Sequence, residues 1–184
     1  MTFVKVFLFT ASVSIAAPAA AQVMVLGSSS ARICYEAAEK ETPPTFEDMQ
    51  HCDDALMGEA LNGHDEVATH VNRGILYYKM GDIPASLQDF DRAIALDPGQ
   101  AEAYLNKGAA LYKAGQSQAA LPLFTVALQK NTERPDLAYF ARAAAHEDLG
   151  DLTSAYFDYR RASEANPDWK QPREEMARFI VRRK

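Results

Sequence analysis

The residues best suited to holding a metal ion in this chain are two cysteines and two histidines between residues 34 and 64. Cys34, His51, Cys52 and His64 offer the sulfur and nitrogen ligands that zinc takes in proteins. His51 and Cys52 are adjacent, however, and the group lacks the C-x-x-C or H-x-x-x-H spacing that closes a tetrahedral site. The sequence therefore predicts no metal site, and we expect no cofactor.

The remaining candidates for catalysis are no better arranged. His146, Glu147 and Asp148 are consecutive, so on a helix their side chains point about 100° apart and cannot converge on one ion. No G-x-S-x-G, phosphate loop or dinucleotide fingerprint occurs in the sequence. We therefore predict that the protein is not an enzyme.

The first 21 residues have the pattern of a cleaved signal peptide. Lys5 provides a short basic region, residues 6–17 form an apolar run, and Ala19-Ala20-Ala21 matches the small-x-small rule for the cleavage site. Cleavage after Ala21 would leave Gln22 as the first residue. The alternative is an uncleaved anchor, but about a dozen apolar residues fall short of the roughly 20 that a membrane helix needs. The sequence thus predicts an exported protein.

Charge and cysteine content fit an exported, acidic protein. Without Lys5, 18 basic and 25 acidic residues remain, a net charge of −7, which argues against general nucleic-acid binding. Residues 28–66 are acidic and residues 170–184 are basic, and this tail is either solvated or attracted to anionic lipid or a partner. In an exported chain, Cys34 and Cys52 favour a disulfide over free thiols or a zinc site.

A ten-residue pattern occurs three times between residues 73 and 151. It begins at Arg73, Lys107 and Arg142, so the steps are 34 and 35 residues. Apolar residues before and within each copy have helical spacing, a glycine such as Gly81 ends a first helix, and Asp97-Pro98 ends a second. Each copy therefore predicts two antiparallel helices, and the fold is predicted to be all-α.

These copies resemble the tetratricopeptide repeat between Val67 and Trp169. The resemblance implies a short right-handed α-solenoid with a concave side. Two departures are His146, at a position that is usually bulky, and Pro122, inside the second helix of copy two. The residues that carry the resemblance are the small Gly74, Gly108 and Ala143, the turn residues Gly81, Gly115 and Gly150, the small Ser86, Ala120 and Ala155, and the aromatic Phe90, Phe124 and Tyr159.

The resemblance also divides the chain into segments. The division is a signal peptide (1–21), an N-terminal segment with a degenerate helical pair (22–66), three repeats (67–100, 101–135 and 136–169), and a C-terminal capping helix with a basic tail (170–184).

Both ends of the predicted solenoid have features of their own. In the N-terminal pair, Ala31 to Glu41 and Phe46 to Asn62, the cysteines fall at the eighth and twentieth repeat positions, which touch in the motif. We therefore expect a Cys34–Cys52 disulfide across this pair. At the other end, Met176, Phe179 and Ile180 form a helical stripe that is predicted to cover the last repeat.

The resemblance further implies that the first helix of each repeat lines a groove that binds a partner. Asn72 and Asn106 could pair with the backbone of an extended peptide, since an amide offers a donor and an acceptor together. Tyr78 and Tyr112 could present flat apolar faces, although such residues can equally just solvate a helix. The predicted groove residues are Val71, Asn72, Ile75, Tyr78, Lys79, Leu105, Asn106, Ala109, Tyr112, Lys113, Phe140, Ala144, Glu147 and Asp148.

One known use of such a groove is not expected here. Chaperone-binding members of the family hold a terminal carboxylate with lysine, arginine and asparagine at four positions, which are Val71, Ile75, Leu137 and Ala141 in this chain. Apart from these four positions, Asn106 is the one residue of this chain that matches the clamp. The sequence predicts that this groove does not bind C-terminal carboxylates.

Signal peptide and repeat type together resemble those of small bacterial envelope proteins. That analogy implies an adaptor or scaffold in the periplasm of a Gram-negative bacterium, with a protein or peptide partner, no nucleic acid and no membrane span. Two alternatives are a structural subunit of an outer-membrane or secretion complex, docking by its convex face or basic tail, and an enzyme acting on cell-wall material.

Overall fold

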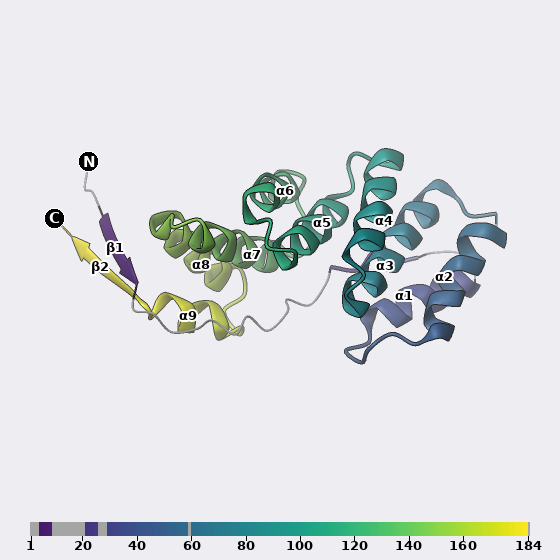
Figure 1. Cartoon of the computed structure of the whole chain (residues 1–184), viewed down its shortest axis with the longest axis horizontal. Coiled ribbons are helices and arrows are strands. Elements are labelled where there is room, and N and C mark those ends of the chain that lie inside the picture. Colours follow the sequence, from purple (N-terminus) through teal and green to yellow (C-terminus); the bar gives the residue numbers. More distant parts are fainter. Residues whose placement is uncertain (1–3, 9–20, 26–28, 59, 184) are drawn as a thin grey trace.

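The protein is an elongated stack of helices, seen here in a computed structural model that describes residues 4–8, 21–25, 29–58 and 60–183 (Figure 1). The prediction of an all-α solenoid is confirmed. Most of the predicted signal peptide (1–21) lies outside the described residues.

Eight helices form four antiparallel pairs that follow one another along the long axis (Figure 1). The first pair is the one predicted to be degenerate, and the other three are the repeats. The pairs are α1 (Ser29–Glu39) with α2 (Phe46–Gly58), α3 (Gly63–Met80) with α4 (Ile83–Leu96), α5 (Ala101–Lys113) with α6 (Ser117–Gln129), and α7 (Pro135–Asp148) with α8 (Leu152–Ala165). Helix α6 runs through Pro122 without a break.

Local sequence signals set the helix ends. Asp82 and Asp151 accept hydrogen bonds from backbone N–H groups three residues further on, which caps α4 and α8. Gly81 ends α3 with φ of 84°, a left-handed conformation that glycine adopts without steric cost. Its equivalents Gly115 and Gly150 have φ of 75° and 78°, so the same turn closes the first helix of every repeat.

Close packing inside the repeats depends on missing side chains. A Cβ atom on Gly74 would lie 2.6 Å from the ring of Phe90, and one on Gly108 would lie 2.7 Å from the ring of Phe124. Real Cβ atoms do not approach other atoms so closely. In the first two repeats the first helix therefore packs so closely against an aromatic ring of the second helix that only glycine fits at the contact.

We expect Gly74→Ala to destabilise the protein. Overpacking against the ring costs about 1–3 kcal/mol, which exceeds the helix propensity of about 1 kcal/mol that alanine brings. Urea unfolding measures the change, and Gly58→Ala is the matched control, because no atom lies within 4 Å of a Cβ at Gly58. Equal stability of the two variants would show that the Phe90 ring tolerates the methyl group.

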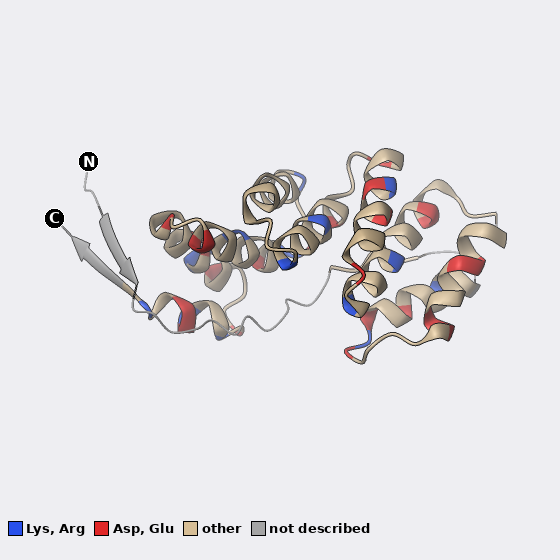
Figure 2. Ribbon diagram, viewed as in Figure 1, with Lys and Arg blue, Asp and Glu red and all other residues tan. Residues whose placement is uncertain are grey.

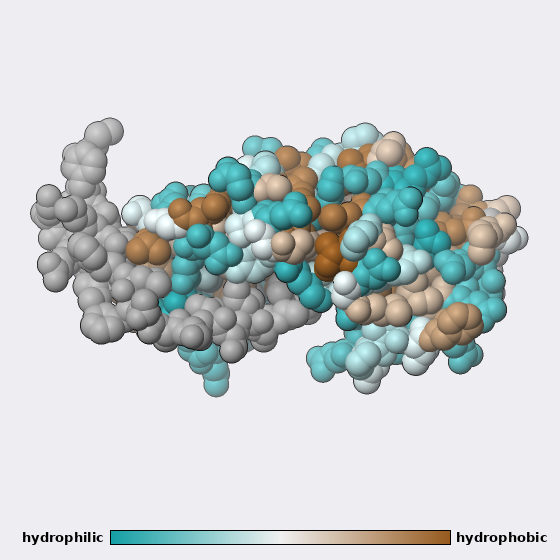
Figure 3. Space-filling view, viewed as in Figure 1, coloured by the Kyte–Doolittle hydropathy of each residue, from teal (hydrophilic) through white to brown (hydrophobic). Residues whose placement is uncertain are grey.

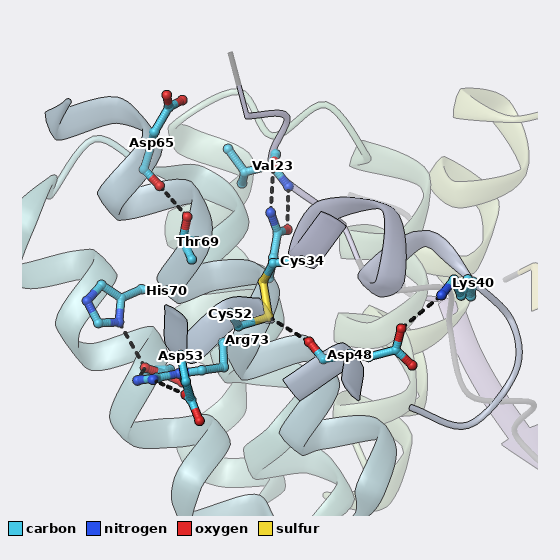
Figure 4. The surroundings of a disulfide bond; sticks show 12 residues. Val23, Cys34, Lys40, Asp48, Cys52, Asp53, Asp65, Thr69, His70 and Arg73 are labelled. Carbon is cyan, nitrogen blue, oxygen red and sulfur yellow. Dashed lines mark hydrogen bonds and ion pairs between the residues drawn. A yellow bond between two sulfur atoms is a disulfide. The ribbon is translucent and has the colours of Figure 1, made fainter. Parts of the chain in front are cut away.

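The N-terminal pair is joined covalently. Cys34 on α1 and Cys52 on α2 form a disulfide with Cα atoms 4.9 Å apart, and both residues are fully buried (Figure 4). The predicted pairing is confirmed, and it removes both thiols from the free-thiol and zinc alternatives. Asp48 on α2 closes the connecting loop. Hydrogen bonds from Lys40 and from the backbone of Thr45 lower the pKa of its carboxyl to about 2.

The C-terminal prediction was partly wrong. Helix α9 (Gln171–Met176) is short, and the chain continues as a strand, β2 (Phe179–Arg183), which pairs antiparallel with β1 (Val4–Leu8). The physical reason is that an aromatic residue and two β-branched residues begin β2, and these residue types favour a strand when a partner strand is available. Phe179 is nevertheless buried against the last repeat, with its ring 6.0 Å from that of Tyr159.

Candidate functional site

The concave side of the solenoid is occupied by an extended piece of the same chain. This segment, Ala21–Val25, is named the strap here. It contacts the first helices of the pairs, since Asn72 on α3 and Asn106 on α5 both hydrogen-bond to it. The groove therefore already contains a peptide.

Two asparagines hold the backbone of the strap. The amide of Asn72 accepts a hydrogen bond from the N–H of Val23 (3.1 Å) and donates one to its carbonyl (2.8 Å), as Figure 4 shows at Val23. Asn106 does the same with the N–H and carbonyl of Ala21, at 3.3 and 2.7 Å. Both asparagines are buried. The predicted pairing of these amides with an extended backbone is thus present, with the strap as the peptide.

The strap alternates like a β-strand. Ala21, Val23 and Val25 are buried, whereas the side chain of Met24 is 60% exposed. Gln22 donates a hydrogen bond from Nε2 to the carbonyl of Ala38 at the end of α1. Every second side chain of the strap therefore points into the groove.

The inward side chains of the strap are part of the hydrophobic core. Val23 and Val25 belong to one buried cluster that includes Cys34, Val71 and Ile75. Ala21 belongs to a second cluster that includes Leu105, Leu137 and Ala141. The groove residues predicted at Val71, Ile75 and Leu105 thus lie beneath the strap rather than on an open surface.

The predicted lysines brace the helices of the groove. Lys113 Nζ donates a hydrogen bond to the carbonyl of Tyr78 (2.9 Å) and lies 4.3 Å from the centre of its ring. Lys79 Nζ donates to the carbonyls of Ala38 and Lys40, where α1 ends. Burial lowers the pKa of Lys79 and raises the pKa of Tyr78. These residues stabilise the walls around the strap.

The edge of the groove at the second and third repeats carries Ala109, Tyr112, Ala144 and Asp148. Ala109 and Tyr112 are half-buried, Ala144 is buried and Asp148 is exposed. Burial, followed by the nearby charges of Asp148 and Glu147, raises the pKa of Tyr112. None of these four has a hydrogen bond to the strap among the described contacts, so their role in binding stays a prediction.

The third repeat does not continue the groove as predicted. Phe140 is 1% exposed, with its ring 4.7 Å from that of Trp169 and 5.2 Å from that of Tyr159. It is therefore a core residue, because those two rings enclose it. The sixth repeat position, which holds Asn72 and Asn106 in the other copies, is Ala141 here, so the pair of amides has no third member.

Glu147 is likewise engaged within the protein. It accepts two hydrogen bonds from the guanidinium of Arg178, at 2.9 and 2.7 Å, and one from the hydroxyl of Tyr159. Arg178 also pairs with Glu175 on α9. One of the basic residues of the predicted tail thus holds the C-terminal segment against the third repeat. At the other end, most of the acidic residues of 28–66 lie on α1 and α2, and Asp65 and Glu66 lie on α3 (Figure 2).

Two largely buried ion pairs position the groove helices, and neither was predicted from the sequence. Arg73 on α3 donates two hydrogen bonds to Asp89 on α4, both 2.8 Å, and Arg142 pairs in the same way with Asp158 on α8. Arg73 also reaches Asp53 on α2. The signal was available, because arginine and aspartate are 16 residues apart in copies one and three.

Other kinds of site find no support in the described part of the chain. No cluster of three or more histidine, cysteine, aspartate or glutamate side chains is placed there to hold a metal, and no described helix is long and apolar enough to cross a membrane. On the face drawn in Figure 3, hydrophobic residues form small separate areas between hydrophilic ones. The groove is therefore the best candidate site.

Stacked helix pairs around an extended peptide define an α-solenoid of the kind built from helical repeats. Models of the tetratricopeptide repeat match residues 71–136 and residues 137–168, which together are more than half of the sequence. The chain belongs to the tetratricopeptide repeat family. No curated protein sequence matches it.

Several solved structures share this fold. The first TPR domain of Spaghetti (RPAP3), bound to an HSP90 peptide, is 22% identical with a TM-score of 0.59, over 65% of this chain and 94% of that domain. The second TPR domain of human RPAP3, in complex with an HSP70 peptide, is 24% identical (TM-score 0.59; 63% and 96%). MamA from Desulfovibrio magneticus RS-1 is 19% identical (TM-score 0.65; 81% and 82%). These similarities show the fold.

Proposed function

We propose that the protein is a non-catalytic adaptor of the bacterial cell envelope that binds an extended segment of a partner protein in its concave groove. One observation carries the proposal: Asn72 and Asn106 each bind both backbone groups of a single residue in an extended peptide. Such contacts recognise a backbone, and the apolar surface beside them accepts side chains. This is the chemistry of a peptide-binding site.

The partner segment is an internal one rather than a C-terminus. The similar RPAP3 domains were solved with HSP90 and HSP70 peptides, so grooves of this fold accept peptides. In this chain the positions that hold a terminal carboxylate in chaperone-binding relatives are Val71, Ile75, Leu137 and Ala141. All four are buried and apolar. A carboxylate at that place would lose its water without gaining a cation.

Two features support a location in the periplasm. The first is the signal-peptide pattern of residues 1–21, and the second is the Cys34–Cys52 disulfide, since such bonds persist in oxidising compartments. Mass spectrometry of the exported chain tests this location, and a first residue of Gln22 is expected.

Photocrosslinking in living cells tests the proposed function. A photoreactive phenylalanine analogue at Ala109, at the edge of the groove, is expected to capture a specific partner. The same analogue at the exposed Gln118 on α6 is the control for the opposite side of the repeat. We expect capture from Ala109 to be lost when Asn72→Ala and Asn106→Ala are added. Capture from Gln118 alone, or capture from Ala109 that persists in the folded double variant, contradicts a groove function.

A further inference from the structure

The strap uses the groups that a partner segment would need. The backbone of Val23 uses the amide oxygen of Asn72 as an acceptor and its amide nitrogen as a donor. The backbone of Ala21 uses the amide of Asn106 in the same way. We propose that the strap is a built-in competitor for the groove, and that the partner segment is extended with small or β-branched apolar residues at every second position. This proposal rests on the proposed function.

The asparagine contacts do not distinguish the strap from another peptide. Every non-proline residue offers the same N–H and carbonyl, so any extended segment can satisfy both amides. Asn72 and Asn106 lie one repeat apart, and they bind strap residues that are two positions apart. A replacement must therefore be extended over at least three residues, which keeps two inward residues in register with the two amides.

The surfaces beneath the strap restrict the inward side chains. Ala21 is 3% exposed and shares a buried cluster with Leu105, Leu137 and Ala141, so a residue much larger than alanine would overpack this place. Val23 and Val25 are buried in an apolar cluster. A charged side chain at these positions would be buried without a partner of opposite charge, which strongly disfavours binding. The outward position of Met24 is solvent-exposed and imposes no such restriction.

The strap competes well because it is tethered. Only residues 26–28 separate it from α1. A short tether gives an effective concentration on the order of millimolar. If the strap leaves the groove open about 1–10% of the time, a partner peptide binds about 10- to 100-fold more weakly than to an open groove.

Substitutions in the strap test the competition in the full chain with its leader attached, in which Ala21 and Val23 both occupy the groove. Val23→Asp places a charge at a buried position and should displace the strap, whereas Met24→Asp places the same charge at the adjacent exposed position. The probe is a fluorescent, end-capped peptide with the sequence of residues 19–27, AAAQVMVLG. We expect it to bind Val23→Asp at least 10-fold more tightly than wild type, and to bind Met24→Asp as it binds wild type.

Further variants make the test decisive. Val23→Pro removes the N–H that Asn72 accepts without adding a charge, so it should act like Val23→Asp even if the charge perturbs folding. A probe with aspartate in place of its first valine should not bind, and one with aspartate in place of its methionine should bind. Equal probe affinity for wild type, Val23→Asp and Val23→Pro overturns the competition, whereas partner capture from Ala109 would still support the proposed function.

The source of the strap is tested in the same samples. Sedimentation should show that wild type and Val23→Asp have the same mass. A wild-type dimer that dissociates in Val23→Asp would mean that the strap binds the groove of a second copy, which overturns a competitor within one chain.

Discussion

Replacing Asp89 with alanine is expected to destabilise the protein by about 3 kcal/mol or more. Asp89 is 3% exposed and accepts hydrogen bonds from Arg73 and His70. Removing one member of a buried ion pair leaves the other charge with too few partners, and such changes cost about 3–5 kcal/mol. Urea unfolding at pH 7 measures the effect.

The matched control removes the other carboxylate of the same arginine. Asp53 also pairs with Arg73, but its side chain is 38% exposed, so Asp53→Ala should cost only about 0–1 kcal/mol. If the two variants lose equal stability, burial of the carboxylate does not determine how much each ion pair contributes to the free energy of unfolding.

The Asp89 effect should depend on pH in a defined direction. Burial alone would raise the pKa of the Asp89 carboxyl, but hydrogen bonds from Arg73 and His70 outweigh it and hold the pKa below its usual range. A carboxyl with a lowered folded-state pKa stabilises the fold above its ordinary pKa of about 4, and this contribution is lost as the pH falls through the folded value. The difference between wild type and Asp89→Ala should therefore shrink below about pH 4.

Breaking the Cys34–Cys52 disulfide is expected to cost about 3 kcal/mol. The two cysteines are 18 residues apart, and closing a loop of this size in the unfolded chain removes about that much conformational free energy. Reductant should lower the urea midpoint of wild type, with the loss concentrated in α1 and α2. A Cys34→Ala, Cys52→Ala double variant should unfold identically with and without reductant. A wild-type midpoint that does not change after full reduction, as counted by thiol titration, contradicts the prediction.

The repeats were the part of this molecule that could be predicted from the sequence. Gly81, Gly115 and Gly150 punctuate helices at a fixed step, and such signals are local, so they predict helix pairs without knowledge of the whole fold. The cysteine pairing followed from the same register, because equivalent repeat positions touch. Asn72 and Asn106 could be proposed as backbone-binding residues because they recur at the same groove position and because an amide offers a donor and an acceptor together.

The contacts that could not be predicted join segments far apart in the sequence. Nothing local shows that the strap binds Asn106, 85 residues away, or that β1 supplies a partner for the Phe179 strand. Phe140 was wrongly assigned to the groove. Its repeat position places it on the groove side of the helix, but the rings of Tyr159 and Trp169 cover it, and this contact between distant residues cannot be read from the repeat pattern. The Arg73–Asp89 pair was not predicted, because the burial of two charged side chains depends on how α3 packs against α4.

The Ala21–Gln22 bond lies between the two residues that the asparagines hold. If the leader is removed there, Val23 stays with Asn72, whereas Ala21 leaves Asn106 together with β1, and the backbone of β2 loses its partner strand. The same cut would thus free one end of the groove and one strand edge at once. Export would then change how much of the groove is open. Both amides are occupied by the strap while the leader is attached, and Asn106 becomes available to a partner once the leader has been removed.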